Sequence, residues 1–373
     1  MRKLPPVFLA VAVMHLMLPA PAEEPKKAGD SVRDSERAVK GAVDPELQKQ
    51  IDQAIDKARA YLIGLCADKA KADPTALMGL FKWGSGEEAL VGMALVQSGS
   101  PPQDPLVQRI WADLQALANG KLKDPTPLSD SYETYSLAVQ LMFADAMMHA
   151  PAGKPWPAKG EKEGVLAWMG KLAERLAANS EAGVWTYTCK NTAAPKAYKV
   201  GGVGTLGLGT PELVAAAKPK SIIFDHSNTQ YAVLGLKAAL LCGVKPRTEV
   251  RWDLILQHVL STQQKDGPKV DLQVSTQARR KLPGAKPARP GWEEVFTDGG
   301  TPDARSRGWN YTSSEGKPSI GMTAAGLATL LVARSEVGKM GKAEKKLVDE
   351  AIHNGVAWFQ HTWSMPKSGF RAV

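Results

Sequence analysis

The chain has 373 residues, of which 44% are hydrophobic, and 47 Lys and Arg against 38 Asp and Glu give it a formal net charge of +9. This composition indicates a folded globular protein and excludes a disordered chain. The basic excess is modest and spread out, and its densest cluster, residues 279–281, is followed closely by four acidic residues. Nucleic-acid binding normally requires clustered basic residues, so we expect no nucleic-acid partner.

The cysteines argue against a disulfide framework and against a structural metal site. Cys66, Cys189 and Cys242 are an odd number, and none belongs to a Cys-x-x-Cys pair. We therefore predict no metal and no cofactor.

The N-terminus has the three parts of a secretory signal peptide. A basic start at residues 1–3 precedes an apolar run at 7–18 and a small-x-small sequence at 20–22. We predict a signal peptide over residues 1–22 and a polar flexible leader over 23–43. No later stretch has about eighteen consecutive apolar residues, so we expect no membrane span after cleavage. The predicted location is outside the cytoplasm, either periplasmic or secreted.

Residues 44–363 are predicted to form one all-α domain in which two kinds of helix alternate, followed by a short tail at 364–373. Four segments are apolar on nearly every side, which is typical of fully buried helices. These segments are 89–96, 135–148, 231–242 and 322–332. Between them lie segments with apolar residues every three or four positions, which predicts half-exposed helices. These are 46–65, 104–118, 162–178, 247–263 and 342–363.

The buried segments begin at regular intervals. Their starts lie near residues 88, 133, 227 and 321, so they are 45, 94 and 94 residues apart, which fits a helix-pair repeat. Helix-capping patterns precede them: Ser85-x-x-Glu88, Asp130-x-x-Glu133, Ser227-x-x-Gln230 and a single Ser319. Two long insertions, 183–224 and 265–318, are rich in Gly, Pro and Lys and are predicted to be loops. Residues 184–188 are predicted to form a short strand that belongs to one β-hairpin.

Several short motifs resemble the prenyltransferase and squalene-cyclase repeat, in which amphipathic helices start with Lys or Arg and an aromatic and end before Gly-x-Trp. The matching residues are Lys57-Ala58 with Tyr61-Leu62-Ile63; Lys162, Gly164 and Trp168 with Asn179 and Gly183-Val184-Trp185; Gln263 to Gly267; Asn354-Gly355 with Trp358-Phe359; and Asp225 to Ala232. The resemblance covers most of residues 46–363. It implies a terpenoid-cyclase-like α/α toroid, with buried helices in an inner barrel and amphipathic helices outside.

The chain lacks the catalytic motifs that the resemblance implies. Squalene-type cyclases use an Asp-x-Asp-Asp motif, which is absent. Protein prenyltransferases hold zinc with an aspartate, a cysteine two residues later and a distant histidine. By position the aspartate is Asp225, but the cysteine position is Ser227 and residues 319–322 contain no histidine. We therefore expect a non-catalytic binding or scaffolding domain for a protein partner, or for an extended apolar or glycan ligand.

An enzyme of the terpenoid-cyclase or carbohydrate-active class is the alternative, since α/α toroids also carry glycoside hydrolases and lyases. Its catalytic candidates are the residues near the starts of buried helices: Asp225, His226, Tyr231 and Glu133. Residues that could line a ligand site at the same end are Trp83, Glu88, Tyr132, Trp185, Tyr187 and Trp309. Helix capping and core packing explain most of these residues equally well.

The count of predicted helices indicates an incomplete toroid. Four buried and five amphipathic helices are fewer than a closed ring of this family contains, and the last amphipathic helix has no buried helix after it. That helix carries Val356, Trp358 and Phe359. We therefore expect a partial toroid that is either truncated relative to its relatives or closed by a partner.

Overall fold

The computed structural model describes residues 45–72, 84–121, 132–150, 153–188, 225–272, 304–312 and 314–364. Within these ranges the protein is all-helical, which confirms the predicted class. The helices are α3 (Pro45–Ala72), α4 (Ser85–Gln97), α5 (Pro105–Ala118), α6 (Glu133–Met148), α7 (Lys162–Ala178), α9 (His226–Leu241), α10 (Trp252–Thr262), α11 (Ile320–Glu336) and α12 (Lys342–Ser364). The predicted signal peptide and leader lie outside the described residues, and so does the predicted tail after Ser364, which is the last residue of α12.

The predicted strand over residues 184–188 is wrong. Val184 makes only an isolated bridge with Glu181, and the second bridge among the described residues joins Lys269 to Arg305. Among the described residues, no ladder of hydrogen bonds continues from this bridge to Trp185.

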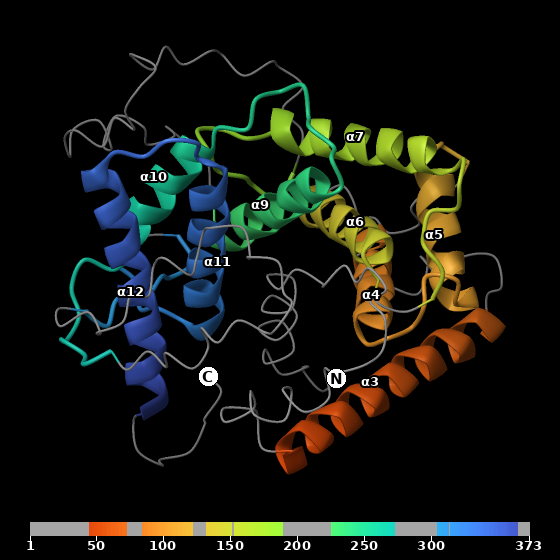
Figure 1. Cartoon of the computed structure of the whole chain (residues 1–373), viewed down its shortest axis with the longest axis horizontal. Coiled ribbons are helices and arrows are strands. Elements are labelled where there is room, and N and C mark those ends of the chain that lie inside the picture. Colours follow the sequence, from red (N-terminus) through yellow and green to blue (C-terminus); the bar gives the residue numbers. More distant parts are fainter. Residues whose placement is uncertain are drawn as a thin grey trace, which may run out of the picture.

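The two predicted kinds of helix are both present, in the predicted alternation. Helices α4, α6, α9 and α11 are apolar on all sides, and most of their residues are buried. Helices α5, α7, α10 and α12 lie outside these four, with α5 against α4, α7 against α6 and α9, and α10 and α12 against α11 (Figure 1). The long helix α3 contacts the rest of the described protein mainly at α4, where Arg59 Nη1 donates to Ser98 O at 2.6 Å.

Helices α4, α6 and α9 run parallel and side by side. Early in α4, Gly86 lies against Ser136 of α6, and one to two turns later Gly92 lies against Phe143. The order of contacts along both helices is therefore the same. The same holds for α6 and α9, where Tyr135 meets Tyr231 near the starts and Asp145 meets Cys242 near the ends. The N-terminal ends of these three helices consequently lie at one end of the protein.

Glycines allow these buried helices to approach one another closely. A Cβ atom added to Gly235 of α9 would lie 2.6 Å from the Cα atom of Ala138 in α6, and one added to Gly92 would lie 2.7 Å from the Phe143 ring. Such separations are shorter than van der Waals contact, so only glycine fits here without a shift of the neighbour.

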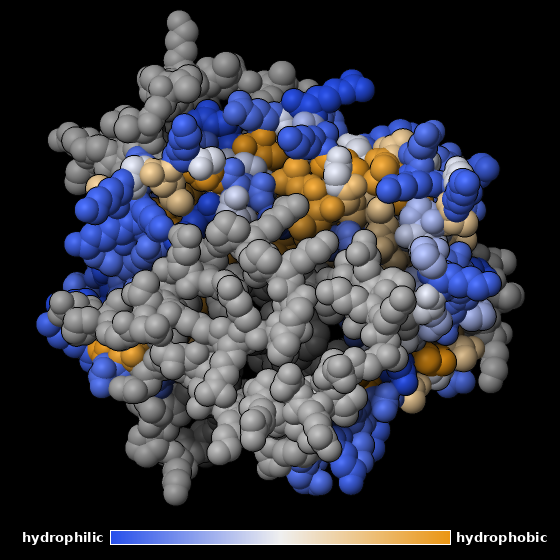
Figure 2. Space-filling view, in the orientation of Figure 1, coloured by the Kyte–Doolittle hydropathy of each residue, from blue (hydrophilic) through white to orange (hydrophobic). Residues whose placement is uncertain are grey.

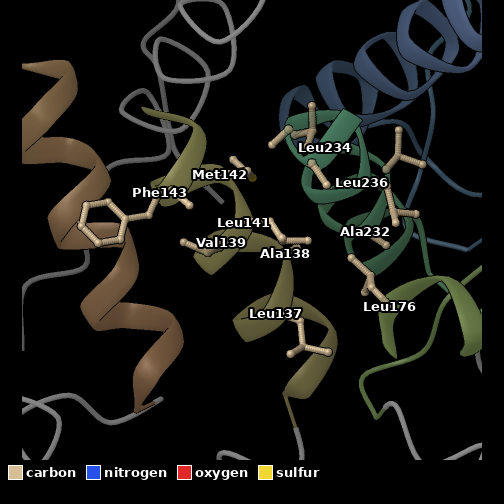
Figure 3. Packing of buried hydrophobic residues seen from close by; sticks show 14 of the residues in the cluster. Leu137, Ala138, Val139, Leu141, Met142, Phe143, Leu176, Ala232, Leu234 and Leu236 are labelled. Carbon is tan, nitrogen blue, oxygen red and sulfur yellow. The ribbon is translucent and has the colours of Figure 1, made fainter. Parts of the chain in front are cut away.

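Helix α6 is the centre of the hydrophobic core. Its side chains are buried around the whole circumference: Phe143 points toward α4, while Ala138 faces α9, where Ala232 and Leu236 lie (Figure 3). Burial of this many aliphatic side chains stabilises the fold by about 25 cal/mol for each Å² of apolar surface that is removed from water.

On the face shown in Figure 2, hydrophobic residues gather in the upper middle and hydrophilic residues lie around the rim. Among the described residues, no helix is both long and apolar enough to cross a membrane.

The helix caps agree with the sequence only in part. Ser319 caps α11 by accepting a hydrogen bond from Met322 N at 3.2 Å, as predicted. The predicted capping box at Ser85 is wrong: Ser85 is the first residue of α4, and the N-cap is Gly84, which adopts a positive φ of 64°. In α9 the cap is Asp225 instead of the predicted Ser227. Asp130 lies outside the described residues.

The last helix is not left with a bare apolar face. Val356 packs on a small second cluster of Leu272, Ala304 and Ala357, and Trp358 and Phe359 are half-buried. Residues of the second long insertion, Leu272 and Ala304, therefore cover part of α12, while Trp358 and Phe359 keep part of their surface exposed.

The close contact between α6 and α9 predicts that Gly235→Ala destabilises the protein by about 1–3 kcal/mol, because the new methyl group overlaps the Ala138 backbone. Gly170→Ala, in the middle of α7, is the matched control. Its Cβ would meet only Val244, at 3.9 Å, so the higher helix propensity of alanine should stabilise by up to about 1 kcal/mol. Urea unfolding of both variants measures the two changes, and a Gly235→Ala variant as stable as Gly170→Ala would contradict the packing.

Candidate functional site

Five of the seven tyrosines gather at the N-terminal ends of α6 and α9. They are Tyr132, Tyr135, Tyr187, Tyr231 and Tyr311. The Tyr135 and Tyr231 ring centroids are 4.8 Å apart, those of Tyr132 and Tyr187 are 5.3 Å apart, and both pairs pack edge to face. The Tyr187 and Tyr311 hydroxyls are hydrogen bonded to each other. Together they form one aromatic cluster.

Two of these tyrosines stand on buried helices, and the others are held by the ends of loops. Tyr135 lies in the first turn of α6 and Tyr231 in the second turn of α9, and they meet because these helices run in parallel. The loop that carries Tyr187 is tied to α6, since Thr134 N donates to Tyr187 O at 3.2 Å and Thr134 Oγ1 donates to Thr186 O at 2.6 Å. The Tyr311 carbonyl accepts a hydrogen bond from His226 N at 3.0 Å.

Four of the five tyrosines line a cavity of about 350 Å³ between α4, α6 and α9. Its lining consists of Gly86, Glu87 and Leu90 of α4, Tyr132, Tyr135, Ser136 and Val139 at α6, and Tyr187 and Tyr231. The wall is mainly aromatic and aliphatic, and the Glu87 carboxylate and the Ser136 hydroxyl add polar groups. A concave, mostly apolar site with a few polar groups is the usual form of a small-molecule site.

The phenol groups of Tyr135, Tyr231 and Tyr311 stay protonated at neutral pH because their pKa values are raised. Burial raises the pKa of Tyr231 to about 12. Burial also raises the pKa of Tyr135 well above its usual value, although the hydrogen bond from Tyr135 Oη to Ser227 Oγ at 2.8 Å opposes that shift. The pKa of Tyr311 rises for the same reason, together with its hydrogen bond to Tyr187. The cavity thus offers neutral hydroxyls that both donate and accept hydrogen bonds.

Three of the cavity residues are candidates predicted from the sequence: Tyr132 and Tyr187 for ligand binding, and Tyr231 for catalysis. Tyr135, which touches three of the other tyrosines, was not among the predicted candidates, and neither were Glu87 and Ser136. A signal was present, because Tyr132 and Tyr135 are three residues apart at the start of a buried helix. The candidate Trp83 lies outside the described residues.

The expectation that Trp185 and Trp309 line the rim of the site is wrong. Their exposed fractions are 1% and 0%. The Trp185 indole N–H donates to Leu176 O, and the Trp309 indole N–H donates to Val259 O, both at 2.8 Å. Trp309 also fills the space left by Gly326 of α11 and Gly355 of α12. Each indole therefore forms a hydrogen bond from the core to an amphipathic helix, α7 for Trp185 and α10 for Trp309.

The acidic candidates Glu88 and Glu133 stand apart from the cavity lining. Glu88 is completely buried within α4. Glu133 begins α6 and forms an ion pair with Arg175 of α7, which joins an amphipathic helix to a buried one.

Asp225 and His226 are buried at the start of α9, where Asp225 caps the helix. Asp225 is fully buried, and its two carboxylate oxygens accept hydrogen bonds from the backbone N and the side-chain Nδ2 of Asn228, both at 2.7 Å. His226 is buried beside His258 of α10, with ring centroids 5.4 Å apart. Neither residue belongs to the lining of the cavity.

The two buried histidines are neutral because a charged imidazole is poorly solvated in the core. Burial lowers the pKa of His226 to about 4. Burial and, to a smaller extent, the charge of His226 lower the pKa of His258 to about 3.

The chain was compared with known protein families, curated proteins and solved structures. No protein-family model, no curated protein and no solved structure matches the chain.

The buried histidines predict acid sensitivity. Their folded-state pKa values lie below the unfolded value near 6.5, so the stability that they confer is fully present above about pH 6.5 and is lost as the pH falls toward 4. The free energy of unfolding should change with pH by up to about 1.4 kcal/mol per pH unit for each histidine.

Urea unfolding between pH 7.5 and 4.5 measures this dependence, and the free energy of unfolding should change less steeply with pH in His258→Gln than in the wild type. His361→Gln, in the half-buried last turn of α12, is the control. Parallel curves for the wild type and His258→Gln would rule out this source of pH dependence.

Proposed function

We propose that this chain is an exported, non-catalytic binding domain with an α/α toroid fold of the prenyltransferase and squalene-cyclase repeat type. The tyrosine-lined cavity at the N-terminal ends of its buried helices is the ligand site. Among the described residues, the arrangement of the helices supports the toroid: α4, α6 and α9 are parallel neighbours, and an amphipathic helix returns the chain between successive buried helices. In this proposal the described helices form an arc of inner and outer helices.

The cavity wall supports a glycan as the ligand. Tyrosine rings offer rigid, flat apolar surfaces at little cost in conformational entropy, and their hydroxyls provide hydrogen bonds at the edges. A sugar ring has matching features, with C–H groups on its faces and hydroxyls around its rim. The volume of about 350 Å³ is at the small end of ligand pockets, which favours one or two sugar rings. The single observation that carries the proposal is the convergence of four tyrosines on this cavity.

The placement of the catalytic candidates supports binding without chemistry. A general acid or base must be within hydrogen-bond reach of the substrate. Asp225 is buried, and both its carboxylate oxygens are engaged with Asn228, while His226 is buried against His258. Of the four candidates only Tyr231 lines the cavity, and its hydroxyl is held protonated by burial.

The proposal predicts that the purified protein binds short oligosaccharides from a panel of gluco-, manno-, galacto- and N-acetylglucosamine-based chains. For the best member, Tyr187→Ala should weaken binding by about tenfold or more, because about 1.4 kcal/mol of stacking is lost. Isothermal titration calorimetry measures the change.

Tyr61→Ala is the matched control, because Tyr61 is 67% exposed on α3 and is absent from the cavity lining. It should leave the affinity unchanged. Equal weakening by both variants, or an absence of binding to the whole panel, would contradict the glycan proposal. Cleavage of a bound oligosaccharide by the wild type, abolished in Asp225→Asn, would instead establish the enzyme alternative.

A further inference from the structure

Three side chains of metal-binding type converge at the ends of α6 and α9 opposite to the tyrosines. They are Asp145 and His149 at the C-terminal end of α6, and Cys242 at the C-terminal end of α9. One ligand atom from each residue lies within 4.8 Å of the other two. The site is independent of the proposed function, because it shares no residue with the cavity.

The packing of α6 against α9 creates this cluster. Asp145 and His149 are four residues apart, so their side chains share one face of the last turn of α6. Cys242 is the C-cap of α9, and the close approach of Gly235 to Ala138 holds the two helices together two turns earlier. The cluster thus joins residues that are 97 positions apart in the chain.

The distances are close to those of a three-ligand zinc site. Asp145 Oδ1 lies 2.9 Å from His149 Nδ1 and 3.4 Å from Cys242 Sγ. Zinc binds such oxygen, nitrogen and sulfur atoms at about 2.0 to 2.3 Å in tetrahedral geometry, which separates the ligand atoms by roughly 3.3 to 3.6 Å. Rotation of the exposed imidazole and a small movement of the thiol would complete the arrangement.

The exposure of the three side chains suits a metal ion that keeps one coordination position open to solvent. Asp145 is buried, Cys242 is half-buried and the His149 side chain is 52% exposed, so the cluster opens to solvent on the histidine side. A carboxylate and a thiolate would balance the two charges of the ion. Burial and the neighbouring Asp145 carboxylate raise the pKa of the Cys242 thiol, and Lys162 at the start of α7 opposes that shift only in part. The thiolate would therefore form together with the bond to the ion, whose charge stabilises it.

We propose that Asp145, His149 and Cys242 bind one zinc ion, with a water molecule as the fourth ligand. On binding, the Cys242 thiol releases its proton to solvent, the sulfur forms a bond to the metal, and no redox change takes place. The ion ties the C-terminal end of α6 to that of α9.

Cobalt(II) is the probe that tests the site, because a cobalt–thiolate bond gives a charge-transfer band in the near ultraviolet. The full-length protein, treated with chelator and titrated with Co²⁺, should bind one ion per chain and show this band. Zn²⁺ should remove the band by displacement. Cys242→Ser should abolish the band, and His149→Gln should weaken Co²⁺ binding by at least about tenfold.

The control variants are Cys66→Ala and Cys189→Ala, which should keep both the band and the stoichiometry. Circular dichroism checks that each variant is folded. His149→Gln provides a test that does not depend on a buried group, because most of that side chain is in solvent. The proposal is overturned if the wild type gives no thiolate band, if the band survives in Cys242→Ser, or if folded His149→Gln binds Co²⁺ as tightly as the wild type.

Discussion

The close packing of α6 between α4 and α9 is the constraint on which the rest of the structure depends. Gly86, Gly92 and Gly235 remove the side chains that would separate these helices. Since the three helices run parallel, residues in their first turns meet at one end and residues in their last turns meet at the other. The tyrosine-lined cavity and the Asp145, His149 and Cys242 cluster are two consequences of the same packing.

The helical fold could be predicted from the sequence because its signal is local. Apolar residues on all sides of residues 135–148 predict a buried helix, and the structure places α6 at the centre of the core. Polar residues between the apolar positions of residues 104–118 predict an amphipathic helix, which α5 is. The sequence also places polar and aromatic candidates at the starts of the buried helices, and two of these candidates, Tyr132 and Tyr231, line the cavity there.

The details of the sites could not be predicted in this way because they depend on contacts between distant residues. Trp185 and Tyr187 are two residues apart in one loop, yet the first is inside the core and the second lines the cavity. Cys242 shows no metal-binding pattern in the sequence, since its neighbours in the cluster come from another helix. Ser227 and Asp225 are both good N-cap residues, and only the structure shows that Asp225 caps α9 while Ser227 accepts the hydrogen bond from Tyr135.

A designed disulfide between α4 and α6 tests the parallel packing most directly. A Cβ atom added to Gly86 would lie 3.3 Å from Ser136 Cβ, close to the roughly 3.5–4.5 Å of a disulfide. With the three native cysteines replaced by alanine, Gly86→Cys with Ser136→Cys should cross-link nearly completely under mild oxidation, as seen by non-reducing electrophoresis. Gly86→Cys with Met148→Cys, whose second cysteine is about 18 Å farther along α6, should stay reduced. A folded Gly86→Cys and Ser136→Cys variant that does not cross-link, or cross-linking of the Met148→Cys pair instead, would contradict the parallel arrangement.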